Sequence, residues 1–242
     1  MREGNAVMAL AQCVPDERYV HTVRELHARD RFVIMDNGAN EKVSFSNEEL
    51  GKRALRLRAD ELVLPDVLYD ADKTFEAATQ YLRECEAWAT PLAQAPQYMA
   101  VIQGGSVDQL RKLVDRFSEE FPIKTLGLPR LLIEHIGLRA TRIDLANWIH
   151  SSYPNRFNIH LLGASTAWVK EPYYVSRYAA HVRSIDTSLP YNYGLQGLRI
   201  NDERLKKVNR PEHYFTKEHQ ATALTTISYN EEVYRSWCNV AR

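Results

Sequence analysis

Three aspartates follow short apolar runs of the sequence, where strands of a sheet would end. They are Asp36 at the end of 31–36 (RFVIMD), Asp66 after 61–65 (ELVLP) and Asp186 within 183–188 (RSIDTS). A single aspartate in such a position is usually a helix cap or a turn residue. A buried carboxylate without a partner costs free energy, so packing does not explain why three apolar strands end in an acid. One carboxylate could attack an anomeric carbon and form a covalent sugar ester while another moves protons. The set therefore indicates exchange or hydrolysis at a sugar carbon.

Amide and glycine residues accompany these acids and suit recognition of a flat heterocycle. The candidate binding residues are Asn37, Gln103, Gly104, Gly127 and His160. A carboxamide can hydrogen-bond the edge of a base, and glycine lets the backbone approach it closely. His160 lies inside an apolar run, where a core histidine satisfied by its neighbours is at least as well supported as a ligand contact.

The elements that must position these residues alternate between apolar runs and amphipathic stretches. We expect strands over 6–11, 31–36, 61–65, 98–103, 123–128, 157–163 and 183–188. We expect helices over 16–29, from Ser46 or Asn47 onward, near 70–89, over 107–120, within 129–152, over 170–182 and in most of 212–241, with an irregular stretch at 188–197. The nearly continuous apolar character of the strands is typical of strands buried on both faces.

Repeated strand–helix units indicate an α/β fold with a parallel sheet, and in such folds functional groups gather at the carboxyl ends of the strands. The length of 242 residues fits either a doubly wound open sheet or a closed (β/α)8 barrel. We expect the barrel, as a single domain over 1–242, with 198–202 (LRIND) as a candidate eighth strand.

Charge is unevenly distributed although it sums to zero. Residues 1–122 carry 15 basic and 21 acidic side chains, and residues 123–242 carry 16 and 10, so the halves have net charges of −6 and +6. The densest basic run in the second half comprises Arg199, Arg204, Lys206, Lys207 and Arg210, and another comprises Lys52, Arg53, Arg56 and Arg58. Such a run can bind phosphates, although a solvated helix face is the more common explanation of a single run.

Several other classes lack support in the sequence. There is no apolar run of 18 residues, no secretory signal pattern and no Walker, GxGxxG or GxSxG motif. Cys13, Cys85 and Cys238 are dispersed and lack metal-ligand spacing. We therefore expect a cytoplasmic protein without a metal or another cofactor, and without membrane contact.

The segments FVIMDNGA, LVLPD, AVIQGG, TLGL, HLLG and SIDTSLPYNYG, over about residues 31–195, resemble in their order the tRNA-guanine transglycosylase superfamily. That family is a (β/α)8 barrel that exchanges guanine for a 7-deazaguanine through a covalent Asp–ribose intermediate. The resemblance implies that Asp186 is the nucleophile, Asp36 the acid–base residue and Asp66 a base-recognising residue. It also implies base contacts from Gln103 with Gly104 and from the backbone of Gly127.

The chain departs from the tRNA enzymes in two ways: it is much shorter, and it has no CxCxxC zinc motif after the nucleophile segment. A compact zinc-free form is similar to the phage DNA-guanine transglycosylases, which place bases such as preQ0 into DNA. The resemblance thus implies DNA and a free 7-deazaguanine base as partners, and the host cytoplasm as the location if a phage encodes the protein. Tyr191 and Tyr193 could stack on a base or pack in an aromatic loop.

Three alternative functions remain open at this point. They are a zinc-free tRNA enzyme, an N-glycoside hydrolase in which water replaces the incoming base, and a non-catalytic nucleic-acid-binding paralogue. Whether the protein is a monomer or a homodimer is open as well.

Overall fold

A computed structural model describes residues 6–88, 95–130, 132, 141–202, 208 and 221–239. Within these residues one parallel sheet contains β1 Ala6–Leu10, β2 Phe32–Asp36, β3 Glu61–Val63, β4 Gln97–Val101, β5 Thr125–Pro129, β6 Asn158–Leu162 and β7 Ser184–Ile185. Each strand pairs with its neighbours along the chain, in the order β1 to β7. The expected α/β class, the parallel pairing and the seven main strand positions are confirmed.

Helices follow most of the strands. They are α1 Glu17–Ala28, α2 Asn47–Leu57, α3 Ala71–Trp88, α4 Val107–Glu120, α6 Thr141–Ser152, α7 Glu171–Tyr178, α8 Leu189–Leu195 and α9 Ala221–Cys238, with short 3-10 turns at Ala11–Cys13, Ala39–Glu41 and Thr166–Trp168. Side-chain caps fix several starts: Asp16 caps α1, Ser106 caps α4, and Ser46 and Glu49 form a capping box on α2.

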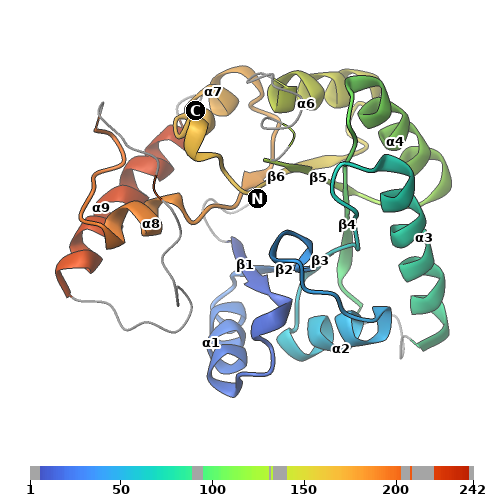
Figure 1. Ribbon diagram of the computed structural model, residues 1–242, viewed down its shortest axis with the longest axis horizontal. Helices are drawn as coiled ribbons and strands as arrows, with labels where there is room; N and C mark the ends of the chain where they lie inside the picture. The colour runs from blue at the N-terminus through green and yellow to red at the C-terminus, as the bar shows by residue number, and fades with distance from the viewer. Residues whose placement is uncertain are drawn as a thin grey trace.

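The sheet curls into a half-barrel instead of the closed eight-stranded barrel that we expected. Figure 1 shows the strands in an arc with α1 to α4 and α6 outside it, while α8 and α9 lie together to one side. Our candidate eighth strand, 198–202, is wrong: this segment is a turn in which the buried Ile200 donates its N–H to Asn230 Oδ1 (2.8 Å). Among the described residues no further strand pairs with β1 or β7.

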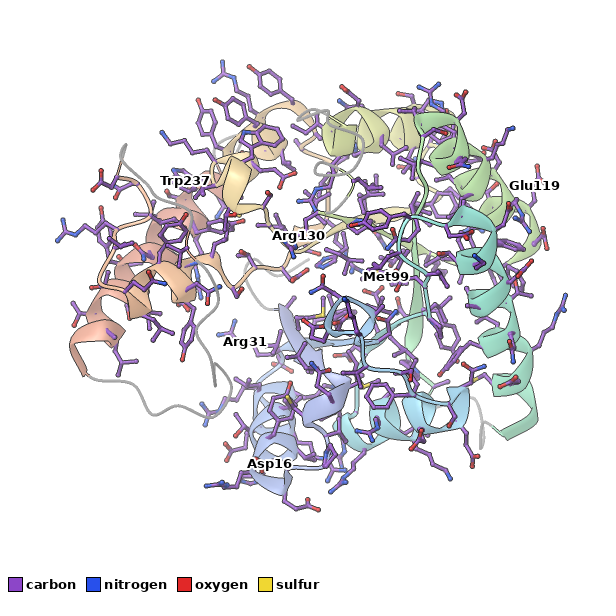
Figure 2. The ribbon with its side chains drawn as sticks, viewed as in Figure 1. Asp16, Arg31, Met99, Glu119, Arg130 and Trp237 are labelled. Carbon is purple, nitrogen blue, oxygen red and sulfur yellow. The ribbon has the colours of Figure 1, made fainter. Side chains whose placement is uncertain are left out.

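The inner face of the arc is filled in layers, because alternate residues of each strand share a face. At the amino ends of the strands, Arg183 donates to both carboxylate oxygens of the buried Glu61 (2.5 and 3.0 Å). Above this pair lies an apolar layer that includes Ile34, Val63 and Met99. Figure 2 shows Met99 directed into the arc, whereas Glu119 lies on the outer surface. The inside of the curled sheet is therefore filled by side chains from the amino ends of the strands up to their carboxyl ends.

The chain after β7 forms α8 over the stretch 188–197, which we expected to be irregular, and α9 within the stretch 212–241, which we expected to be helical. A small separate core joins them and includes Leu189, Tyr193 and Tyr234. Gly194 of α8 lies so close to α9 that a Cβ there would be 2.4 Å from Ile227 Cγ1. Close packing against α9 therefore explains a helix whose sequence, with proline and glycine, does not favour one.

Candidate active site at the strand carboxyl ends

The predicted site residues meet at one end of the half-barrel. Asp36 is the last residue of β2, Asp186 directly follows β7, and Asp66 and Gln103 lie three and two residues after β3 and β4. Because all the strands are parallel, these ends share one edge, which we call the rim.

Asp66 is held at the rim by two side-chain amides. Asn37 Nδ2 donates to Asp66 Oδ1 (2.7 Å) and to the Leu64 carbonyl (2.6 Å). Gln103 Nε2 donates to Asp66 Oδ2 (2.6 Å), and Gln103 Oε1 accepts from the Tyr69 N–H (3.2 Å). Burial raises the pKa of Asp66, and the two amide hydrogen bonds oppose this rise. Each carboxylate oxygen keeps a further acceptor direction for a ligand.

Asp36 lies in the most unfavourable surroundings for a negative charge at the rim. Burial raises the pKa of Asp36 to about 7, and the nearby carboxylates of Glu41, Asp186 and Asp66 add to this rise. A hydrogen bond from the Asn37 backbone opposes it. A carboxyl group with this pKa can gain and lose a proton near neutral pH, as an acid–base catalyst requires.

Asp186 is anchored through one of its two oxygens. Its Oδ1 accepts from the Gly163 N–H (2.8 Å) and lies 3.2 Å from His160 Nε2. His160 Nδ1 is 2.8 Å from Ser184 Oγ, which in turn accepts from Arg183 Nε (3.3 Å). A carboxylate oxygen accepts hydrogen bonds, so at the contact with Asp186 the Nε2 of His160 is the donor.

The anchoring of Asp186 leaves its other oxygen available for chemistry. The side chain is 26% exposed, and no hydrogen bond to Oδ2 occurs within the described part of the chain. His160 is buried and has both ring nitrogens engaged by Ser184 and Asp186, so it supports the carboxylate from below.

A buried ion pair fixes the backbone that holds Asp186. Arg142 and Glu171 are both fully buried and joined by two hydrogen bonds (2.8 and 2.5 Å). Arg142 Nη1 also donates to the carbonyl oxygens of Leu128, Leu162 and Gly163. This guanidinium ties the ends of β5 and β6 together, and Gly163 is thereby set to donate to Asp186.

The two predicted glycines have packing reasons to be glycine. A Cβ at Gly127 would lie 2.6 Å from Leu162 Cδ1 and 3.0 Å from Met99 Sδ, and its carbonyl accepts from the Ile102 N–H (2.9 Å). A Cβ at Gly104 would lie 3.2 Å from atoms of Gln109 and Leu110 at the start of α4. Their predicted contacts with a base stay predictions.

Three rim residues were missed by sequence reasoning. Gln12 follows β1, and its buried Oε1 has no hydrogen-bond partner among the described residues. Glu41 follows β2 and acts on Asp36 through its charge. Arg130 follows β5; its side chain contacts Gly163 and points toward the inside of the arc (Figure 2). The rule that found the aspartates, inspection of the residues after each strand, finds Gln12 and Arg130 when it is applied to β1 and β5.

The two basic runs differ in how many of their side chains the structure describes and in the contacts that these make. In the first, Arg199 stacks over Tyr229 (4.8 Å), and Arg204, Lys206, Lys207 and Arg210 lie outside the described residues. In the second, Lys52 pairs with Glu48 and Arg56 with Glu17, while Arg53 donates to the Ala11 carbonyl and stacks over Phe45. Three of the four cations in the second run are therefore engaged by the protein itself.

The two tyrosines after β7 have different surroundings. Tyr193 is buried in the α8–α9 core, so the packing alternative holds for it. Tyr191 is partly exposed.

Neither the protein-family models nor the curated protein sequences include a match to this chain. Within the described residues, no helix has the length and apolar character needed to span a membrane, and no cluster of three or more His, Cys, Asp or Glu side chains is arranged to hold a metal ion.

Proposed function

We propose that this protein exchanges a guanine base in DNA for a 7-deazaguanine, by double displacement through a covalent Asp–sugar intermediate. The observation that carries the proposal is the division of labour between two carboxyl groups at one rim. Asp186 has one oxygen fixed by N–H donors and the other uncommitted, while Asp36 has a pKa of about 7. A nucleophile and a separate proton carrier are what base exchange requires.

In the first displacement, Asp186 Oδ2 attacks C1′ of a deoxyguanosine turned out of the helix, and the C1′–N9 bond breaks. Asp36 in its acid form gives a proton to the departing guanine. Turning the nucleotide out is necessary because C1′ is inaccessible to a side chain within stacked DNA. The Gly163 and His160 donors hold Asp186 Oδ1 in place before attack.

In the second displacement, the 7-deazaguanine occupies the place of the guanine. Asp36, now a carboxylate, takes the N9 proton, N9 attacks C1′, and the ester bond to Asp186 breaks. Atoms and charge balance over the two steps, and both carboxyl groups return to their starting states. Asp66 accepts from N–H groups on the base edge, in the orientation that Asn37 and Gln103 impose.

The test is incorporation of a labelled 7-deazaguanine into a DNA oligonucleotide. The wild-type protein should incorporate the label, and denaturing gels should show a protein–DNA adduct that Asp186→Asn lacks. Asp144→Asn is the matched control, because Asp144 is an exposed acid on α6. Exchange by Asp186→Asn at the wild-type rate would refute the nucleophile assignment. Label entering tRNA and not DNA would refute the substrate, and free guanine with an abasic product would identify a hydrolase.

A further inference from the structure

A row of aromatic side chains lies on the 3-10 turn and the helix that follow β6. Trp168 in the 3-10 turn and Tyr174 on α7 have ring centroids 5.4 Å apart, and Tyr174 and Tyr178 are nearly parallel at 6.5 Å. Tyr174 is 37% exposed and Tyr178 is 59% exposed, the largest value among the large apolar side chains that the structure describes. We call these three residues the aromatic row. Trp168 is partly buried and packs against the core, whereas Tyr174 and Tyr178 are exposed and the buried side of α7 is formed by other residues.

The exposed charges within the segment 166–178 are both positive. Lys170 and Arg177 are exposed, and the Arg177 guanidinium lies 5.9 Å from the centre of the Tyr178 ring. The one acid of α7, Glu171, is fully buried and paired with Arg142. The segment 166–178 thus presents rings and two cations to solvent without an exposed carboxylate.

The aromatic row is connected to the rim by a short stretch of chain. Gly163, whose N–H holds Asp186, is five residues before Trp168. Five extended residues span at most about 17 Å, so the first ring lies within a few nucleotides of the nucleophile.

We infer that the aromatic row binds the unpaired DNA strand that carries the target nucleotide, with bases stacked on Trp168, Tyr174 and Tyr178 and phosphates near Lys170 and Arg177. Rings that accept any base, interleaved with cations that follow the backbone, are the usual features of single-strand binding surfaces. The inference rests on the proposed function for its choice of ligand. Within that function, it names the surface that would keep the strand open once a nucleotide has been turned into the rim.

The experiment is fluorescence anisotropy of a labelled 12-nucleotide single strand of DNA, in the Asp186→Asn background so that no chemistry intervenes. The double substitution Tyr174→Ala with Tyr178→Ala should weaken binding at least 25-fold, because loss of stacking on each ring weakens binding about fivefold or more. The matched control is Tyr174→Phe with Tyr178→Phe, which keeps both rings and should keep the affinity within about twofold. Tyr174 and Tyr178 are both exposed, so circular dichroism should show the same melting temperature for all variants.

The two cations have a separate readout. Lys170→Gln with Arg177→Gln should reduce the slope of log affinity against log salt by about 1.4, since each phosphate contact to a single strand contributes about 0.7. An unchanged affinity in the alanine pair, or an equal loss in the phenylalanine pair, would overturn the aromatic row as a stacking surface. DNA binding that depends on the rings, in a protein whose wild-type form exchanges no base, would support the aromatic row and refute the proposed function. Failure of the inference and failure of the proposed function therefore give different results.

Discussion

Replacing Asp36 by asparagine should stabilise the protein above pH 7 and leave its stability near pH 4 almost unchanged. Burial and the carboxylates of Glu41, Asp186 and Asp66 raise the pKa of Asp36 from 3.8 to about 7. Because the folded state holds this proton more tightly than the unfolded chain, stability falls as the pH rises from about 4 to 7. The penalty is complete above pH 7. Asparagine carries no charge and removes it.

The magnitude follows from the size of the shift. A change of about three pKa units corresponds to about 4 kcal/mol, at about 1.4 kcal/mol per unit. Urea unfolding followed by circular dichroism at pH 4, 6 and 8 measures this difference in the free energy of unfolding. The substitution should shift the urea concentration at the midpoint and leave the dependence of that free energy on urea concentration unchanged. Local relaxation around the charge reduces the gain, so we expect about 2 to 4 kcal/mol at pH 8.

A difference between Asp36→Asn and wild type that is the same at all three pH values would refute this reasoning. Two controls bracket the result. Glu76→Gln changes an exposed acid on α3 and should alter stability by less than about 0.5 kcal/mol. Asp66→Asn also removes a charge that burial disfavours, but one of the amide donors from Asn37 and Gln103 then loses its acceptor, at a cost of about 1 to 3 kcal/mol. We therefore expect Asp66→Asn to stabilise the protein less at pH 8 than Asp36→Asn does.

Three further predictions concern the interior and the rim. Gly127→Ala should destabilise by about 1 to 3 kcal/mol in urea unfolding, because its methyl group would overlap Leu162. A smaller loss would mean that the interior is loosely packed. Arg183→Met should lose about 3 to 5 kcal/mol by leaving Glu61 buried without its partner, and adding Glu61→Leu should recover most of the loss. Gln12→Ala should leave the free energy of unfolding within about 0.5 kcal/mol of wild type, since the buried Oε1 has no hydrogen bond to lose among the described residues. In the incorporation assay it should raise KM for the base about tenfold, and an unchanged KM would exclude Gln12 from the base site.

Much of the sheet could be predicted because its signals are local. Buried apolar runs mark the strands, and a capping box marks the start of α2. The predicted helix 107–120 coincides with α4. Closure into a barrel was not predictable in this way, because it depends on whether the last strand pairs with the first. Here the chain after β7 turns into α8 and α9, and α8 owes its form to the packing of Gly194 against Ile227.

The site could be predicted as a set of residue types at strand ends, and the parallel sheet brings them to one rim. The network could not be predicted, because it depends on side-chain contacts between distant segments. The amide of Asn37 reaches Asp66, and His160 lies beneath Asp186 between two hydrogen-bond partners. The influence of Glu41 on Asp36 likewise depends on how the 3-10 turn after β2 folds back.

The ion pair between Arg183 and Glu61 has a consequence for how the molecule assembles during synthesis. Every strand pairing joins neighbours along the chain, so β1 to β6 can be added one unit at a time as the chain emerges. The pair between Glu61 and Arg183 joins residues 122 positions apart and forms only when β7 arrives and the sheet has curled. Until then Glu61 lacks the guanidinium that neutralises it, which disfavours the curled interior. The last strand also brings Asp186 close enough for its charge to act on Asp36. Curvature and the proposed site would then be completed in the same late step, and a chain interrupted before β7 would have neither.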